Sequence, residues 1–145
     1  MHRVRKKAGI TRRVTQRYTT DCAVTCIAMV AGVSWRRAVY TAFPRSAFDK
    51  IASDEMSIDF THARRTLKKL GVSCRYTTTN IDLDTLRRPA ILMFEWDNSR
   101  EFHCVVYDPS TPRGRFLDPT GYSEGRSFYI REWRRNGCES LVVCG

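Results

Sequence analysis

The chain has 145 residues and a formal net charge of +10, from 25 lysines and arginines against 15 acidic residues. This length predicts a single domain with a sizeable core. No run of about 18 apolar residues is present, so we expect no transmembrane segment. No apolar segment follows the first basic residues, so we expect no secretion signal and a cytoplasmic protein.

The cysteines of a chain without a secretion signal are expected to be reduced thiols. No two of the six have the C-x-x-C spacing that zinc ribbons and fingers use, so we predict no metal site and no other cofactor. The six are Cys22, Cys26, Cys74, Cys104, Cys138 and Cys144.

The positive charge is concentrated at the N-terminus, where residues 1–17 carry seven basic side chains and no acidic one. Such a segment can bind nucleic acid, an acidic protein surface or anionic lipid, or it can be a solvated tail. We predict a flexible basic arm over residues 1–13 and a single folded domain over residues 14–145. The seven basic residues are Arg3, Arg5, Lys6, Lys7, Arg12, Arg13 and Arg17.

A polar segment then meets an apolar helix at Cys22. The small and apolar residues Ala23–Ala31 predict a buried helix that Thr20 or Asp21 caps and Gly32 ends. Cys22 would lie in the first turn, where free N–H groups and the helix dipole lower the pKa of a thiol. It is therefore a candidate nucleophile, and the alternative is an ordinary buried cysteine.

The pattern changes from helices to strands along the rest of the chain. Helices first and strands second predict an α+β fold, with the apolar helix packed on an antiparallel sheet. The expected helices are residues 35–43 after the cap Ser34, residues 57–70, a turn within 82–88 and a small helix around 132–135; residues 45–56 are expected to be a loop with some local helix. The expected β-segments are 72–78, 90–96, 101–107 and 115–118, with a hairpin turn at 97–100, and residues 127–130 and 139–144 complete the chain.

A nucleophilic cysteine needs a base, which is usually a histidine. Of the three histidines, His2 lies in the basic arm and His62 lies beside arginines on a helix, where a surface role is expected. His103 lies within a strand, which would hold it rigidly on the face opposite to Phe102 and Cys104. The alternative for His103 is a half-buried, hydrogen-bonded side chain without a catalytic role.

A third group should orient the histidine, and Asp118 at the end of the next short strand fits this role. The competing Asp108 lies five residues along the histidine's own strand, about 16 Å away at roughly 3.3 Å per residue, so we expect it to form a turn. Acyl transfer also needs an oxyanion donor. The side-chain amide of Gln16, six residues before the cysteine, could donate beside the Cys22 backbone N–H.

These features resemble the papain-like peptidases that process bacteriocin leaders, a family whose domain usually heads an ABC transporter and cuts after a double glycine. The resemblance rests on Gln16, Asp-Cys at the start of an apolar helix, Cys26 four residues later, a strand histidine and an Asp-Pro. It covers about residues 14–135. It implies a papain-like fold with Cys22 as nucleophile, His103 as base, Asp118 as orienter and Gln16 as oxyanion donor. Ala23 stands where that family has glycine.

We therefore predict a thiol protease that hydrolyses a peptide or isopeptide bond, with glycine before the cut as the resemblance implies. One alternative is a binding or inhibitor protein of the same fold, which docks on nucleic acid or an acidic protein through its basic surface, including residues 1–17. A second alternative is deamidase or transglutaminase-like acyl transfer on a protein target. In each case we interpret Cys26 as a core residue.

Overall fold

The computed structural model describes residues 13–96, 101–121 and 124–144. The elements in chain order are α1 (Cys22–Ala31), α2 (Trp35–Ala42), α3 (Ala47–Ser53), α4 (Phe60–Lys69), β1 (Cys74–Thr77), the 3₁₀ turn η1 (Leu83–Thr85), β2 (Ala90–Trp96), β3 (Glu101–Asp108), β4 (Arg115–Leu117), α5 (Arg126–Asn136) and β5 (Gly137–Val143).

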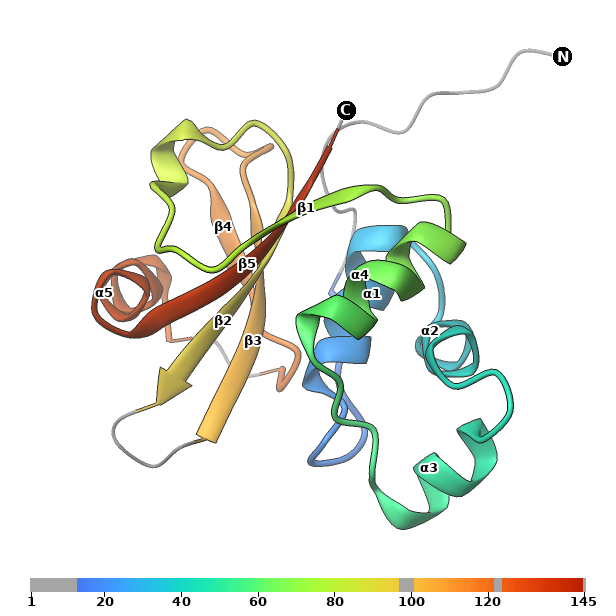
Figure 1. The fold of residues 1–145 in the computed structure, drawn as a ribbon. Helices are drawn as coiled ribbons and strands as arrows, with labels where there is room; N and C mark the ends of the chain where they lie inside the picture. The colour runs from blue at the N-terminus through green and yellow to red at the C-terminus, as the bar shows by residue number, and fades with distance from the viewer. Residues whose placement is uncertain (1–12, 97–100, 122–123, 145) are drawn as a thin grey trace, which may run out of the picture.

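The strands form one antiparallel sheet in the order β1-β5-β2-β3-β4. Helices α1 and α4 pack against one face of this sheet, α2 and α3 lie beyond them, and α5 packs against the other face (Figure 1). The predicted α+β class is therefore confirmed. The predicted hairpin is also present, because β2 and β3 pair in one register from Ala90 opposite Tyr107 onward.

The apolar helix begins and ends as its sequence predicts. Gly32 has the left-handed conformation with φ of 67°, which a glycine adopts without strain and which ends α1. Asp21 occupies the N-cap position, but its side chain makes no capping bond and turns to other partners described below. The next helix has the predicted cap, since the Ser34 side chain accepts a hydrogen bond from the Arg37 N–H at 3.1 Å.

Two predicted boundaries were wrong. Helix α4 begins at Phe60 rather than residue 57, because the Asp59 side chain accepts the His62 N–H at 2.8 Å and sets the first turn. Residues 126–136 form one continuous helix instead of separate segments. The predicted turn at 97–100 and residues 1–12 of the predicted arm lie outside the described residues.

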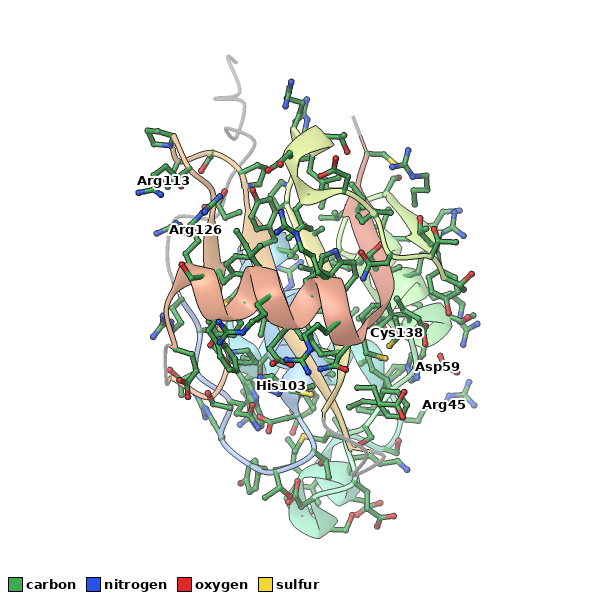
Figure 2. The ribbon with its side chains drawn as sticks, turned by 90° about the vertical axis from the view of Figure 1, so that its left-hand side faces the viewer. Arg45, Asp59, His103, Arg113, Arg126 and Cys138 are labelled. Carbon is green, nitrogen blue, oxygen red and sulfur yellow. The ribbon has the colours of Figure 1, made fainter. Side chains whose placement is uncertain are left out.

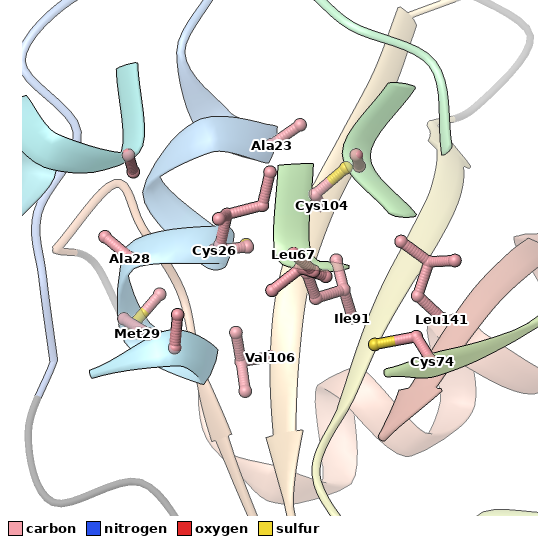
Figure 3. Packing of buried hydrophobic residues seen from close by; sticks show 14 of the residues in the cluster. Ala23, Cys26, Ala28, Met29, Leu67, Cys74, Ile91, Cys104, Val106 and Leu141 are labelled. Atoms are coloured by element: carbon pink, nitrogen blue, oxygen red, sulfur yellow. The ribbon is translucent and has the colours of Figure 1, made fainter. Parts of the chain in front are cut away.

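The core has one apolar cluster on each side of the sheet and a third among the helices. The cluster beneath α1 and α4 contains Cys26, Cys104 and Leu141 (Figure 3). The cluster beneath α5 contains Val105 and Trp133. Adjacent residues of β3 therefore point to opposite faces, as the strand pattern predicts. The third cluster lies where α1, α2 and α3 meet.

No single helix in the described residues is long and apolar enough to cross a membrane. The pair α1 and α2 satisfies the length and composition criteria together, but the two helices are bent by 113°.

Candidate active site

Cys22 is the first residue of α1, where the helix presents unpaired N–H groups and the positive end of its dipole. Its thiol is half-buried. Its pKa is lowered from the ordinary 9.0 to about 5. The largest cause is a hydrogen bond with the Cys104 thiol, followed by the hydrogen bond and charge of His103, and these together outweigh the opposing effect of burial. At neutral pH Cys22 is therefore a thiolate.

Cys104 is the second thiol at this point of the molecule. It is 2% exposed, and the hydrogen bond to Cys22, together with burial, raises its pKa well above the ordinary range. It therefore stays protonated and donates its S–H to the Cys22 thiolate. Cys104 lies at the edge of the core near Ala23 (Figure 3). Cys26, one turn further along α1, is fully buried with a raised pKa, in agreement with a core role.

His103 lies between the thiol and a carboxylate. Its Nε2 is 2.9 Å from Asp118 Oδ1, which leaves Nδ1 as the ring nitrogen available for its hydrogen bond with Cys22. Burial disfavours the imidazolium, but the hydrogen bonds and charges of Asp118 and Cys22 outweigh burial and raise the pKa of His103 to about 9. A thiolate–imidazolium pair is therefore the stable state between about pH 5 and pH 9.

Asp118 is held by more donors than the sequence indicates. Besides His103, Oδ1 accepts the Thr120 N–H at 3.0 Å and the Thr120 hydroxyl at 2.8 Å. Oδ2 accepts the hydroxyl of Tyr129 at 2.7 Å. Burial favours the neutral acid, but the bonds from His103 and Tyr129 outweigh it and lower the pKa of Asp118 to about 2. The carboxylate is therefore ionised and fixed in orientation.

Sequence reasoning missed Tyr129. It is 1% exposed on the buried face of α5, four residues before the equally buried Trp133. That spacing indicates a core-facing stripe and gives no sign of a bond to a site residue. Figure 2 shows α5 crossing in front of the sheet, with His103 beside it. Helix α5, which the sequence prediction had divided into separate segments, therefore anchors the Asp118 carboxylate.

Asp21 organises the segment before the nucleophile. It is fully buried, and its carboxylate accepts the indole N–H of Trp35 at 2.7 Å. It also accepts the backbone N–H groups of Arg17 at 2.8 Å and Tyr18 at 3.0 Å. These bonds fold residues 17–20 back over the start of α1. Sequence reasoning treated Asp21 only as a helix cap.

Gln16 lies in the same segment, and its backbone N–H donates to the carbonyl of Pro119, the residue after Asp118. Its side-chain Nε2 donates to the Tyr18 carbonyl at 2.7 Å and, more weakly, to Asp21 Oδ1 at 3.5 Å. Among the described residues, no hydrogen bond joins this amide to Cys22. The structure thus brings Gln16 to the site but turns its amide toward its own loop.

The remaining candidates lie elsewhere. Asp108 is buried and accepts Arg115 Nε at 2.9 Å, so it stabilises the turn after β3, as predicted. His62 is half-buried rather than a surface side chain, because its Nε2 lies 2.8 Å from the Ala42 carbonyl and joins α4 to α2. His2 lies outside the described residues. Within those residues, no group of three or more His, Cys, Asp or Glu side chains is arranged to hold a metal ion.

A pocket of about 460 Å³ opens directly beside Cys22. It lies between the helical side of the molecule and the sheet. Its lining comes from the start of α1, the loop before α4 and the strands β2, β3 and β5: Thr20, Cys22, Ala23, Ser57, Ile58, Asp59, Met93, Phe102, Cys104 and Glu139.

A thiolate at a helix N-terminus, an imidazole on a strand and a carboxylate behind it, on an α+β scaffold, define a papain-like cysteine peptidase. The model of the Peptidase C39 family matches residues 11–130, which is most of the chain. The chain therefore belongs to this family of bacteriocin-processing cysteine peptidases, and peptides are its substrate class. The comparison with curated proteins found no match.

Proposed function

We propose that this peptidase acts through a Cys22–His103–Asp118 triad that cleaves a peptide or isopeptide bond. The observation that carries the proposal is that one imidazole contacts both groups, with Cys22 on one side and Asp118 at 2.9 Å on the other. This is the arrangement that a thiol nucleophile, its acid–base partner and the orienting carboxylate require.

In the first step the Cys22 thiolate attacks the scissile carbonyl carbon, and the carbonyl π electrons move onto oxygen. His103, protonated at Nδ1, gives its proton to the leaving nitrogen as the tetrahedral intermediate collapses to a thioester. A water molecule then attacks the thioester, His103 takes the water proton, and the carboxylic acid leaves as Cys22 is released. Asp118 holds the ring and stabilises the imidazolium.

The backbone N–H of Cys22 and the amide of Gln16 are the proposed oxyanion donors. The Gln16 amide has two N–H bonds, of which the one toward Asp21 is long at 3.5 Å. This weakly held N–H is the one that we assign to the oxyanion. Pro119 supports the assignment, because its carbonyl fixes the Gln16 backbone beside the triad carboxylate.

The experiment is labelling with a peptide that ends in a glycine electrophile, followed by mapping of the modified cysteine. Labelling is expected at Cys22, to be lost in Cys22→Ala and to be strongly slowed in His103→Gln. Cys138→Ala, which removes another half-buried thiol, is the matched control and should label normally. Labelling spread over all six cysteines would contradict the proposal. The mass of a protein product separates cleavage from deamidation, which adds about one dalton, and from cross-linking.

A second candidate function is docking on a polyanion, which the outer surface of α5 favours. Arg126, Arg131, Arg134 and Arg135 line one surface of this helix, and the ion pairs within the described residues include none of them. We propose that this surface, with the basic residues of the segment 1–17, binds an acidic partner or nucleic acid. Binding should weaken as salt rises and should survive Cys22→Ala.

A further inference from the structure

Asp54 has a backbone conformation that few residues other than glycine adopt. It ends α3 in the left-handed region, with φ of 51° and ψ of 52°. Within the ranges that the structure describes, it is the only non-glycine residue with a positive φ. Its N–H donates to the Ile51 carbonyl at 3.2 Å, in a helix end where glycine is the usual residue. The helix end alone therefore favours glycine, and the aspartate is held there by its side chain.

The Asp54 carboxylate holds the segment that leads into the nucleophile. Its Oδ2 accepts the backbone N–H of Thr19 at 3.2 Å and also the Thr19 hydroxyl. Its Oδ1 accepts the backbone N–H of Thr20 at 3.1 Å and the Thr20 hydroxyl at 2.6 Å. The bond from the Thr19 hydroxyl, followed by that from Thr20, lowers the pKa of Asp54 to about 2. The carboxylate is therefore ionised throughout the pH range in which Cys22 is a thiolate.

Thr20 extends this hold to a second segment of the pocket lining. Its hydroxyl donates to Asp54 and also accepts the backbone N–H of Met56 at 2.9 Å. Thr20 lines the pocket beside Cys22, and so does Ser57, the residue after Met56. The segment before α1 and the loop before α4 are therefore joined to each other through one carboxylate and one hydroxyl.

Two carboxylates share the segment that precedes the nucleophile. Asp21 accepts the first two backbone N–H groups of residues 17–20, and Asp54 accepts the last two. The Gln16 amide donates to the Tyr18 carbonyl at 2.7 Å. The position of the proposed oxyanion donor therefore follows the position of this segment.

We infer that Asp54 is a positioning residue for the reaction, which holds residues 17–20 so that the Gln16 amide meets the oxyanion. The inference rests on the proposed function, which assigns the oxyanion to this amide and to the Cys22 N–H. Oxyanion donors act because they are fixed before the charge develops, and a misplacement of about 1 Å can reduce a rate about a hundredfold. The causes of the lowered Cys22 pKa lie in other groups. Loss of the Asp54 carboxylate should therefore destabilise the tetrahedral intermediate and leave the thiolate intact.

The test measures kcat and KM for a blocked peptide in which a coumarin amide follows two glycines, with the wild-type chain and with Asp54→Asn. Asparagine tolerates the left-handed conformation and keeps one acceptor oxygen, but its NH₂ group cannot accept a hydrogen bond. We expect kcat to fall about tenfold or more with KM nearly unchanged, because the bond to the oxyanion exists only in the transition state. Alkylation of Cys22 by iodoacetamide forms no oxyanion, so its rate should not change.

Further variants keep the inference falsifiable if Asp54→Asn destabilises the fold, which the urea unfolding midpoint reports. Asp54→Gly removes the carboxylate and relieves the backbone strain, so it should fold and show the same loss of kcat. Thr20→Val removes one of the two hydroxyls, and adding it to Asp54→Asn should cost less than the product of the two separate effects, because both act through one bond. Asp49→Asn, on the exposed side of α3, removes the same charge from the same helix and should leave kcat unchanged.

The outcomes separate this inference from the function on which it rests. An unchanged kcat in Asp54→Asn and Asp54→Gly overturns the positioning role while the thiol chemistry stands. Equal losses of peptide hydrolysis and of iodoacetamide alkylation overturn it as well, because they would show a damaged thiolate and not a displaced oxyanion donor. A raised KM at constant kcat would restrict Asp54 to the pocket wall and also overturns it. If the wild-type chain does not hydrolyse the peptide, the proposed function fails, and the positioning role fails with it.

Discussion

The reaction of Cys22 with iodoacetamide tests the electrostatics of the site directly. At pH 6 a thiol with a pKa of about 5 is roughly 90% thiolate, whereas a thiol at the ordinary 9.0 is about 0.1% thiolate. A thiolate of lower pKa is also a weaker nucleophile, by roughly sixtyfold over four pKa units with a Brønsted slope of about 0.45. At pH 6, Cys22 is therefore expected to react with iodoacetamide about fifteenfold faster than an ordinary thiol.

The assay maps alkylated cysteines by mass spectrometry as a function of time and pH, with glutathione as the ordinary thiol. Cys138 is the internal reference, because burial raises its pKa and it should remain unmodified at pH 6. The rate at Cys22 should reach half its plateau near pH 5. His103→Gln removes a hydrogen bond and a charge that favour the thiolate, so the midpoint should move to higher pH.

Two results would refute this reasoning. The first is a midpoint for Cys22 above about pH 8, which would place the thiol in the ordinary range. The second is an unchanged midpoint in His103→Gln, which would mean that the imidazole does not contribute to the charge of the thiol.

Three further predictions concern the candidate site and the side chains that support it. Peptide cleavage should rise near pH 5, where the thiolate forms, and decline near pH 9, where the imidazolium is lost; a rate that still climbs at pH 10 would contradict this. Tyr129→Phe should lower the free energy of unfolding in urea by about 2 kcal/mol, because it removes a buried bond to the ionised Asp118, and an unchanged midpoint would argue against that bond. Asp21→Ala should cost about 3 kcal/mol in the same assay, because the Trp35 indole and two backbone N–H groups lose their acceptor, whereas a loss below about 0.5 kcal/mol would show that they find others.

Local sequence patterns predicted the parts of the fold in which local chemistry determines the structure. The apolar run before Gly32, the Ser34 cap and the β2–β3 hairpin all depend on neighbouring residues. The start of α4 was wrong because Ser57 and Asp59 are both good caps, and packing of Phe60 into the core selects the later one. The boundary of α5 was wrong because its aromatic residues suit a strand equally well.

The same distinction applies to the candidate site: the sequence indicated some of its residues, and only the tertiary structure shows the others. The resemblance and the strand order pointed to Cys22, His103 and Asp118, which the structure brings together. The bonds from Cys104 and Tyr129 depend on how α1 and α5 meet opposite faces of the sheet, and no spacing within the chain indicates them. Glu139 likewise lines the pocket beside Cys22 because β5 inserts between β1 and β2.

The position of β5 also determines when during synthesis the sheet and the Asp118 carboxylate can reach their final arrangement. Residues 137–143 form an interior strand of the sheet, and the helix just before them supplies the Tyr129 hydroxyl that holds the Asp118 carboxylate. A nascent chain in which these residues are still inside the ribosome has neither the closed sheet nor that bond. The hydrogen bond from Tyr129 to Asp118 therefore forms only after most of the chain has been synthesised. Translation of β5 supplies the strand that joins β1 to the rest of the sheet.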